Sequence, residues 1–565
     1  MAGVSVSTPW LLAADARIDN ASDLQRLAGP SSSGASGAHI LLTAWAKRGP
    51  ALLQDIVGDF ALAVYDQVRR TLTLARDPTG QRPLFYKIQG SAIAFASLPS
   101  GLRRVFFDSE TRIALLARNL ENVPGDAGKS YFGGIEKVEP GEVIEFRGGT
   151  ITRWLYWNPQ VVSIPRDRGE DYVETYRSLL DAAVACRIDS ARPIASQLSS
   201  GLDSSAVTAT AAALIEPKSD LVALTAAPHP EFNEEPIRHR FGDESVLAAE
   251  TARMHGIRHV IIRDTPPLFD VARIEASYLE GPVLDPFNMA WWTQVRREAR
   301  KLGARTLLTG EIGNLTLNAG SLQMLSALIQ RGSWAQWLRQ ALSLGAQSNV
   351  NWRGILVNSF GHWLPHPVRD RLQQVFLGVP TAEQQSFVRP EWREQLVTKT
   401  PAPEADNPYQ SLRDAIRRTD FGLQRKAALA SHGIEELDPL SDRRILDFSL
   451  RVPPEVLLRD GRTRALARTA LEDRVPTAVL DLQTRGLQSA DWHIRISQQE
   501  ARDVFESVSA NAQVQDLLNL DKMDRAIQDW PTTDLNGFAN SMLYRNQLVT
   551  ALSVGIFLSE SQNGI

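Results

Sequence analysis

Short runs of alternating apolar and polar residues dominate the first 160 residues of the chain. Each run ends at Gly, Asp or Pro, a pattern that is typical of β-strands. These runs lie at residues 58–66, 71–77, 84–88 and 91–97. Residues 141–157 add two further runs around Gly148 and Gly149 and predict a β-hairpin. Helical spacing is confined mainly to 38–57 and 109–118, so we predict an α+β domain over residues 1–162.

The pattern changes after residue 168, where apolar residues recur at helical spacing over 171–187. Short apolar runs then predict buried strands, at residues 193–198, 221–227, 259–263 and 305–309. Helical patterns separate these runs, for example at 243–255 and 290–302. Alternation of strand and helix favours a parallel sheet with helices on both faces. We therefore predict an α/β domain over 168–565, with a helical extension from residue 322 onward.

Composition and charge limit what these elements can form. The chain has 565 residues, 43% of them hydrophobic and 22% charged, which suits two or three globular domains rather than one. A net charge of −4 provides no basic field for nucleic acid. Cys186 is the single cysteine, which excludes a disulfide framework and a thiolate metal cluster. No apolar run approaches the roughly 20 residues of a membrane span, so we expect a cytoplasmic protein with no nucleic-acid or membrane partner.

The segment LSSGLDSS, residues 198–205, joins a predicted strand to an Ala-rich helical pattern. Backbone amides in such a turn, together with the helix N-terminus, can bind an anion. Asp203 would repel a bare phosphate but could hold a metal ion between phosphate oxygens. A Ser/Asp cap on an ordinary crossover helix explains the same residues. The candidate ligand-binding residues are Leu198, Ser199, Ser200, Gly201, Leu202, Asp203, Ser204 and Ser205.

This segment resembles the SGGxDS pyrophosphate loop of the N-type ATP pyrophosphatases, and within them the asparagine synthetase branch. Ser200 occupies the position of the second glycine. The resemblance implies ATP and Mg²⁺ as cofactors, cleavage of ATP between the α- and β-phosphates, and adenylation of a carboxylate. It also implies that the strand 221–227, with Thr225, lies against the adenine ring.

A second segment, LLTGEIGN at 307–314, is similar to the asparagine synthetase segment SGEGxDE. By this resemblance Gly310 contacts the nucleotide and Glu311 is the catalytic glutamate near the reacting carbonyl. Asn314 stands where the family has a magnesium-binding Asp, so Asp203 and Asn314 are the implied metal ligands. A carboxylate that satisfies free amides at a helix start is the alternative interpretation of Glu311.

The segment RVPTAVLDLQTRGLQSADW, residues 474–492, resembles the part of asparagine and β-lactam synthetases that carries an essential lysine. Arg485 occupies that position and is the second candidate catalytic residue. An arginine can bind phosphate oxygens with two parallel hydrogen bonds but almost never gives up a proton. A structural arginine before a glycine turn is the alternative. Residues 432–458 also resemble the family, and alone they would indicate helix packing.

The N-terminal domain is similar to the glutaminase domain of class II amidotransferases, an Ntn-type fold, through GDFALAVYD and LARDPTGQRPLFY at 58–86. That family uses an N-terminal cysteine as its nucleophile. The sequence here begins Met-Ala-Gly-Val and has no cysteine before Cys186. Without a thiolate no γ-glutamyl thioester forms. We therefore expect a degenerate domain that makes no ammonia and lacks the first strands of its family.

A carboxylate activated without an ammonia source must react with another amine. The run at 307–320 and the segment TRGLQSADW look most like the macrolactam cyclases of lasso-peptide biosynthesis. This resemblance implies that an Asp or Glu side chain of a ribosomal precursor peptide is adenylated and then attacked by the peptide's own α-amine. It also implies a leader peptidase and a leader-binding protein as partners, and a peptide cavity supplied by residues 322–430.

Two other functions remain open at this point. One is a synthetase that uses free ammonia or a small amine, as in asparagine or β-lactam formation. A large apolar cavity beside the nucleotide site would argue against it. The other is a nucleotide-binding scaffold without chemistry, because three catalytic positions depart from the synthetase pattern. Release of AMP would exclude the scaffold.

Overall fold

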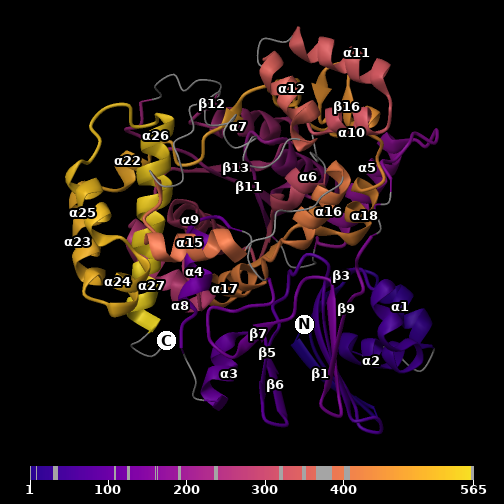
Figure 1. Cartoon of the computed structure of the whole chain (residues 1–565). Coiled ribbons are helices and arrows are strands. Elements are labelled where there is room, and N and C mark those ends of the chain that lie inside the picture. The colour runs from indigo at the N-terminus through magenta and orange to yellow at the C-terminus, as the bar shows by residue number, and fades with distance from the viewer. Residues whose placement is uncertain are drawn as a thin grey trace.

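The computed structural model describes residues 2–7, 9–29, 36–106, 110–123, 127–159, 161, 163–188, 193–233, 240–316, 322–346, 351–363, 385–399 and 407–561. We call residues 2–159 the N-terminal region and residues 163–561 the C-terminal region. Figure 1 shows the N-terminal region as a β-rich body in indigo and purple, below the helix-rich C-terminal region.

Two antiparallel sheets form the N-terminal region. Within its described residues the larger sheet has the order β1-β2-β3-β4-β8-β9 and the smaller one β6-β5-β7. The larger sheet contains β1 (Ala2–Ser7), β2 (Trp10–Ile18), β3 (Gly58–Asp66), β4 (Thr71–Arg76), β8 (Glu142–Arg147) and β9 (Thr150–Leu155). The smaller sheet contains β5 (Phe85–Gln89), β6 (Ala92–Ala96) and β7 (Ile135–Lys137). The helices are α1 (Ala21–Ala28), α2 (Gly37–Arg48), η2 (Gly49–Gln54), α3 (Pro99–Phe106) and α4 (Ile113–Leu120).

The alternating pattern of the sequence explains how these sheets pack. In β3, Phe60, Leu62 and Val64 belong to one core cluster and face the helices. The intervening Ala61 and Ala63 pack with residues of the smaller sheet in another cluster. The strands and the hairpin expected from alternation are therefore present as β3 to β6 and β8 to β9. Ahead of these strands, β1 and β2 pair in antiparallel fashion. The expectation that the first strands of the family are missing stays a prediction.

A parallel sheet is the centre of the C-terminal region. Its order among the described residues is β13-β11-β10-β14-β15, and every pairing is parallel. The strands are β10 (Ile194–Gln197), β11 (Leu221–Ala226), β13 (Arg258–Ile262), β14 (Thr306–Leu308) and β15 (Glu435–Leu437). Four of them were predicted. β15 was missed, because its three residues lie in a segment that resembles helix packing.

Helices cover both faces of this sheet, as the alternating pattern predicted. Leu221 and Ala223 pack into the cluster that contains α6 (Leu202–Leu214), whereas Val222 and Leu224 pack with α9 (Pro286–Lys301). The remaining helices of this part are α5 (Tyr172–Ala185), η3 (Lys218–Asp220), α7 (Ser245–Met254), α8 (Leu268–Leu279) and η4 (Glu311–Leu315).

The rest of the C-terminal region is mainly helical, as expected from residue 322 onward. Its first part, α10 to α20, lies beside the sheet, and the C-terminal helices form the yellow layer at the left of Figure 1. The first part contains α10 (Met324–Gln330), α11 (Trp334–Gly345), α12 (Trp352–Phe360), η5 (Gly361–Trp363), α15 (Pro390–Lys399), α16 (Pro408–Arg417), α17 (Gly422–His432), η6 (Pro439–Ser441), α18 (Arg443–Ser449), α19 (Pro454–Leu457) and α20 (Ala465–Ala470). The second contains α22 (Trp492–Arg495), α23 (Gln498–Ser509), α24 (Ala512–Leu517), α25 (Leu520–Gln528), α26 (Phe538–Asn540), η7 (Ser541–Leu548) and α27 (Val549–Ser561). The short helix α21 (Thr477–Leu480) packs instead in the cluster that contains α20. Short paired strands are β12 (Arg240–Phe241) with β18 (Arg485–Gly486), and β16 (Leu458–Arg459) with β17 (Arg462–Thr463).

A buried cluster of charges joins the two regions. The guanidinium of Arg187, which is 1% exposed, lies 3.3 Å from Asp19, 3.7 Å from Asp59 and 3.2 Å from Asp442. Burial opposes the charged form of Arg187, but these carboxylates outweigh it and raise the pKa of the guanidinium. Cys186 lies beside this cluster, where burial raises the pKa of its thiol. The single cysteine is thus part of the interface between the regions.

Candidate active site

The loops that follow β10 and β14 lie side by side at the carboxyl edge of the parallel sheet. The chain leaves β10 toward β11 on one side and later returns to β14 on the other, so the strand order reverses between them. Ligands of open α/β sheets bind at such a reversal. A Cβ atom on Gly310 would lie 3.0 Å from the backbone carbon of Asp203, and one on Gly313 would overlap the Asp203 carboxyl group. The fold therefore brings Asp203 against the segment that carries Glu311 and Asn314.

The turn after β10 is closed by its own serine hydroxyls. The amide of Ser199 donates to the Ser204 hydroxyl at 3.0 Å, and the amide of Gly201 donates to the Ser199 hydroxyl at 3.1 Å. The Ser204 hydroxyl in turn donates to the carbonyl oxygen of Gly201 at 3.1 Å. Leu202 and Ser205 are buried, and Asp203 is half-buried in the first turn of α6. The turn thus has the compact geometry that an anion-binding loop before a helix requires.

Glu244 is a further acidic residue at this turn. The hydroxyl of Ser200 donates to its carboxylate at 2.5 Å. Burial raises the pKa of Glu244, and the bond from Ser200 opposes that rise. A Cβ atom on Gly486 would overlap the same carboxyl group. Glu244 therefore connects the turn to β18, a contact that the sequence did not indicate.

Arg485 lies in β18, which pairs in parallel with β12 so that Arg485 is opposite Arg240. Its side chain is exposed. Arg464, which sequence reasoning missed, is close enough to interact electrostatically with both Asp203 and Arg485. Burial lowers the pKa of the Arg464 guanidinium and Arg485 lowers it further, whereas Asp203 raises it. Arg464 therefore lies near both Asp203 and Arg485, and a bound anion would stabilise the charges of the two guanidinium groups.

Glu311 is held by a chain of buried charges. Arg425 Nη2 donates to Glu311 Oε2, and the hydroxyl of Thr309 donates to the same oxygen at 3.3 Å. Arg425 Nη1 also donates to Glu436 at 2.9 Å, and Arg296 donates to Glu436 at 2.8 Å. Burial opposes the charge of Glu436, but the two guanidinium groups outweigh it and lower the pKa of Glu436. None of these supporting residues was predicted.

Asp438 fixes the backbone next to Glu311. Its carboxylate accepts hydrogen bonds from the amide of Ile312 at 2.9 Å and from the amide of Leu440 at 2.9 Å. Burial raises the pKa of Asp438 to about 6, and the charge of Glu311 contributes to the rise while Arg425 opposes it. The carboxyl end of β15 therefore supports the loop that follows β14.

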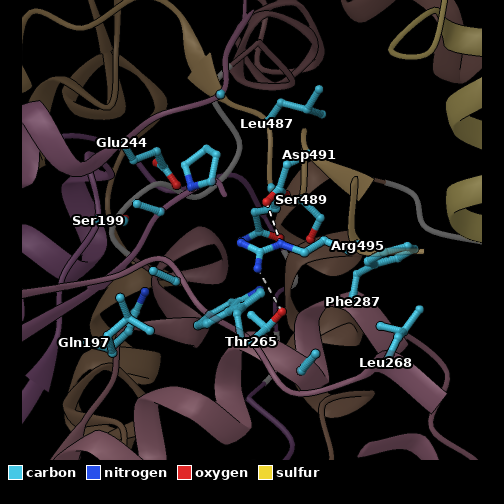
Figure 2. Close-up of a pocket in the computed structure, with 18 of the residues that line it drawn as sticks. Gln197, Ser199, Glu244, Thr265, Leu268, Phe287, Leu487, Ser489, Asp491 and Arg495 are labelled. Atoms are coloured by element: carbon cyan, nitrogen blue, oxygen red, sulfur yellow. Dashed lines mark hydrogen bonds and ion pairs between the residues drawn. The ribbon is translucent and has the colours of Figure 1, made fainter. Parts of the chain in front are cut away.

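A first cavity opens beside the turn, along the carboxyl ends of β10, β11 and β13. Figure 2 shows Ser199 and Glu244 on one side and Arg495 in the middle. Arg495 donates to Asp491 at 2.6 Å and to the hydroxyl of Thr265 at 3.1 Å. The wall of the first cavity includes Leu198, Ala226, Ala227, Ile262, Leu268 and Trp291. An apolar wall beside a phosphate-type turn suits a purine base with its phosphates.

A second cavity of about 630 Å³ lies between the N-terminal and C-terminal regions, and Glu311 is on its wall. Helix α9 separates it from the first cavity. Phe287, Ala290 and Trp291 of this helix line the first cavity, whereas Met289, Trp292 and Arg296 line the second. The rings of Trp291 and Trp292 stack with centroids 4.6 Å apart. The N-terminal region contributes Phe85, Leu115, Lys129, Tyr131 and Lys137 to the second cavity.

Thr225 and the region 322–430 were predicted to contribute to ligand binding, and the described residues show where they lie. The Thr225 hydroxyl donates to the carbonyl oxygen of Leu198 at 2.8 Å and lies 2.8 Å from His259 Nε2, and the side chain is buried. It supports the cavity wall from behind. Among the described residues of the region 322–430, those that line the second cavity lie in 418–424, and the other described lining residues belong to the N-terminal region, to 279–296 and to Glu311. Residues 347–350, 364–384 and 400–406 lie outside the described residues.

Sequence comparison identifies the class of protein that has this site. The asparagine synthase family matches residues 175–558, and the glutamine amidotransferase domain matches residues 8–157. Because the first match covers more than half of the chain, the chain belongs to the asparagine synthase family. Its relatives include ATP-dependent ligases that form carbon–nitrogen bonds.

Individual relatives have low sequence identity to this chain, although two asparagine synthetases align with more than three quarters of it. "Asparagine synthetase [glutamine-hydrolyzing] 3" of Bacillus subtilis is 24% identical over 471 residues, which are 79% of this chain and 69% of that protein. A putative asparagine synthetase of Mycobacterium bovis is 26% identical, and the alignment covers 76% of this chain and 67% of that protein. "Amidase chry2" of Gibberella zeae is 26% identical, and the alignment covers 49% of this chain and 42% of that protein.

Among the described residues, no helix is long and apolar enough to cross a membrane.

Proposed function

We propose that this protein is an AMP-forming ligase that closes the macrolactam ring of a lasso peptide. It would adenylate an Asp or Glu side chain of a ribosomal precursor peptide, and the peptide's own α-amine would then attack the acyl-adenylate. The observation that carries this proposal is the second cavity, which has Glu311 on its wall and lies across α9 from the first cavity. Its volume of about 630 Å³ falls in the range of cavities for large organic ligands. Ammonia needs far less space.

ATP would bind with its base in the first cavity and its phosphates on the turn Ser199–Asp203. The phosphates would replace the hydroxyl groups of Ser199 and Ser204 as partners of the turn amides. Arg464 and Arg485 would stabilise the charge that develops as pyrophosphate leaves. Asp203 and Asn314 provide a carboxylate and an amide oxygen, which fit the oxygen preference of Mg²⁺, and they would hold the ion with the nucleotide phosphates. The ion would neutralise phosphate charge in the bound nucleotide.

Glu311 is suited to accept a proton when the amine attacks. Arg425 and Thr309 both donate to its Oε2 atom, and among the described residues Oε1 accepts no such hydrogen bond. The amine nitrogen would form the amide bond, the bond between the acyl carbon and AMP would break, and Glu311 Oε1 would accept the proton released from nitrogen. Arg425 holds the carboxylate in one orientation for this step.

A ligase that uses ammonia or a small amine is the second candidate. The names of the Bacillus and Mycobacterium relatives favour it. The second cavity is also not purely apolar, since Lys137, Arg296 and Asp420 line it. A scaffold without chemistry is the third candidate, and any release of AMP with a substrate would exclude it.

The test is mass spectrometry of reactions that contain the protein, ATP, Mg²⁺ and candidate precursor peptides. The peptides come from short reading frames next to the gene, and the proposed leader peptidase and leader-binding protein are included. A product that has lost one water, formed together with AMP, is the expected result. The Asp203→Asn variant should form neither product. AMP formation with ammonia or a small amine, but no dehydrated peptide, would overturn the macrolactam proposal in favour of the second candidate.

A further inference from the structure

Helix α17 begins directly against a loop of the N-terminal region. This loop spans residues 77–83 and belongs to the segment that resembles the amidotransferases. A Cβ atom on Gly422 would lie 2.7 Å from the amide nitrogen of Pro83 and 2.9 Å from the carbonyl oxygen of Gly80. Only glycine allows so close an approach at this position. The first turn of α17 is therefore fixed by backbone of the N-terminal region.

Ion pairs between the N-terminal region and the residues before and after α17 stabilise the same contact. The fully buried Arg76 donates to Asp420 at 2.8 Å, and Lys137 lies 2.7 Å from the same carboxylate. Burial opposes the charge of Asp420, but these two cations outweigh it and lower its pKa far below the usual range. Arg82 donates at 2.5 Å to Glu435, the first residue of β15. The N-terminal region thus contacts both ends of the segment that runs from α17 into β15.

Arg425 lies one helical turn into α17 and connects this contact with the candidate catalytic residue. Its Nε donates to the side-chain oxygen of Gln81 at 3.3 Å, its Nη1 to Glu436, and its Nη2 to Glu311. A guanidinium is planar, so partners on three of its nitrogens define both its position and its plane. Gln81 is the partner that the N-terminal region supplies.

We propose that the N-terminal region is a positioning part of the ligase site. Gln81 orients the guanidinium of Arg425, and Arg425 orients the carboxylate of Glu311 that faces the second cavity. Replacement of a whole buried ion pair by apolar residues is often neutral for stability, whereas a misplacement of about 1 Å near a reacting group can lower a rate 100-fold. This assignment rests on the proposed function, and it gives the amidotransferase-type domain a use that needs no glutamine hydrolysis.

Steady-state kinetics of four variants test the assignment. Gln81→Met keeps the size of the side chain but removes the acceptor, and we expect kcat to fall about 10-fold while the KM for ATP stays constant. Gln81→Glu restores an acceptor and should stay within about twofold of the wild-type kcat. Arg425→Lys cannot bind three partners in one plane and should lose about 100-fold in kcat. Arg443→Gln is the control, because Arg443 joins the two regions through Leu53 and Gln54, away from Glu311.

Hydrogen–deuterium exchange provides a measurement that needs no substrate. Faster exchange of segment 309–316 in Gln81→Met, but not in Arg443→Gln, is the expected result. If no substrate is turned over yet this exchange pattern appears, the proposed function fails and the positioning assignment stands. A wild-type kcat and wild-type exchange in Gln81→Met, or an equal loss of kcat in Arg443→Gln, would overturn the assignment.

Discussion

Gly313 lies directly against the carboxyl group of Asp203, with no space for a side chain between them. Asp203 lies in the first turn of α6, after β10, and Gly313 lies in η4, after β14. Their contact joins the phosphate-type turn to the segment that carries Glu311 and Asn314.

Substitution of Gly313 by Ala should therefore impair chemistry more than folding. The added methyl group would overlap the Asp203 carboxylate and displace it from its position at the turn. We expect AMP formation to fall at least about 100-fold, because metal and phosphate ligands act only in correct geometry. Gly361→Ala is a matched control, since a Cβ atom there meets Val357 at an ordinary 3.5 Å. Equal rates in the two variants would contradict a functional contact.

Replacement of Arg464 by Gln should weaken the binding of ATP. The charge of Arg464 is destabilised by burial and by Arg485, so an anionic phosphate would stabilise it and gain affinity. We expect the Kd for Mg-ATP, measured by isothermal titration calorimetry, to rise about 10-fold. Arg462→Gln removes a nearby exposed arginine that pairs with Asp481 and should leave the Kd within about twofold. An unchanged Kd in Arg464→Gln would remove this residue from the phosphate site.

The buried cluster around Arg187 predicts a large loss of stability. Arg187→Leu would leave the carboxylates of Asp19, Asp59 and Asp442 without a shared cation, and loss of one partner of a buried pair costs about 3–5 kcal/mol. Arg26→Leu breaks the exposed pair with Asp23 and should cost less than about 1 kcal/mol. Urea unfolding of both variants beside the wild type measures the difference. Similar midpoints would show that the cluster does not join the two regions energetically.

Asp438 predicts a specific pH dependence of stability. Its folded-state pKa of about 6 is above the usual 3.8, so the folded protein binds the proton more tightly than the unfolded chain. The resulting stabilisation is complete below about pH 4 and is lost as the pH rises through 6. Relative to Asp438→Asn, the wild type should lose up to about 3 kcal/mol of unfolding free energy between pH 4 and pH 7. A difference that stays constant with pH, or that grows in the opposite direction, would contradict this assignment.

Sequence patterns predicted the parts of the site that are local. The strand–turn–helix around Ser199 to Asp203 follows from small residues between an apolar run and an Ala-rich run, and the segment of Glu311 follows a buried strand in the same way. Arg425, Glu436 and Gln81 could not be predicted, because each is an ordinary charged or polar residue until the fold brings three distant segments together. β15 was missed for a related reason. Three residues are too few for a period, and their pairing with β14 is a tertiary contact.

Helix α9 is a wall shared by both cavities, and its stacked Trp291 and Trp292 face one cavity each. A ligand that shifts this helix in one cavity changes the shape of the other. By thermodynamic linkage, each ligand then alters the affinity of the other by the same factor. The order in which nucleotide and acceptor substrate bind would thus be governed by one helix, and an inhibitor designed for either cavity would also change occupancy of its neighbour.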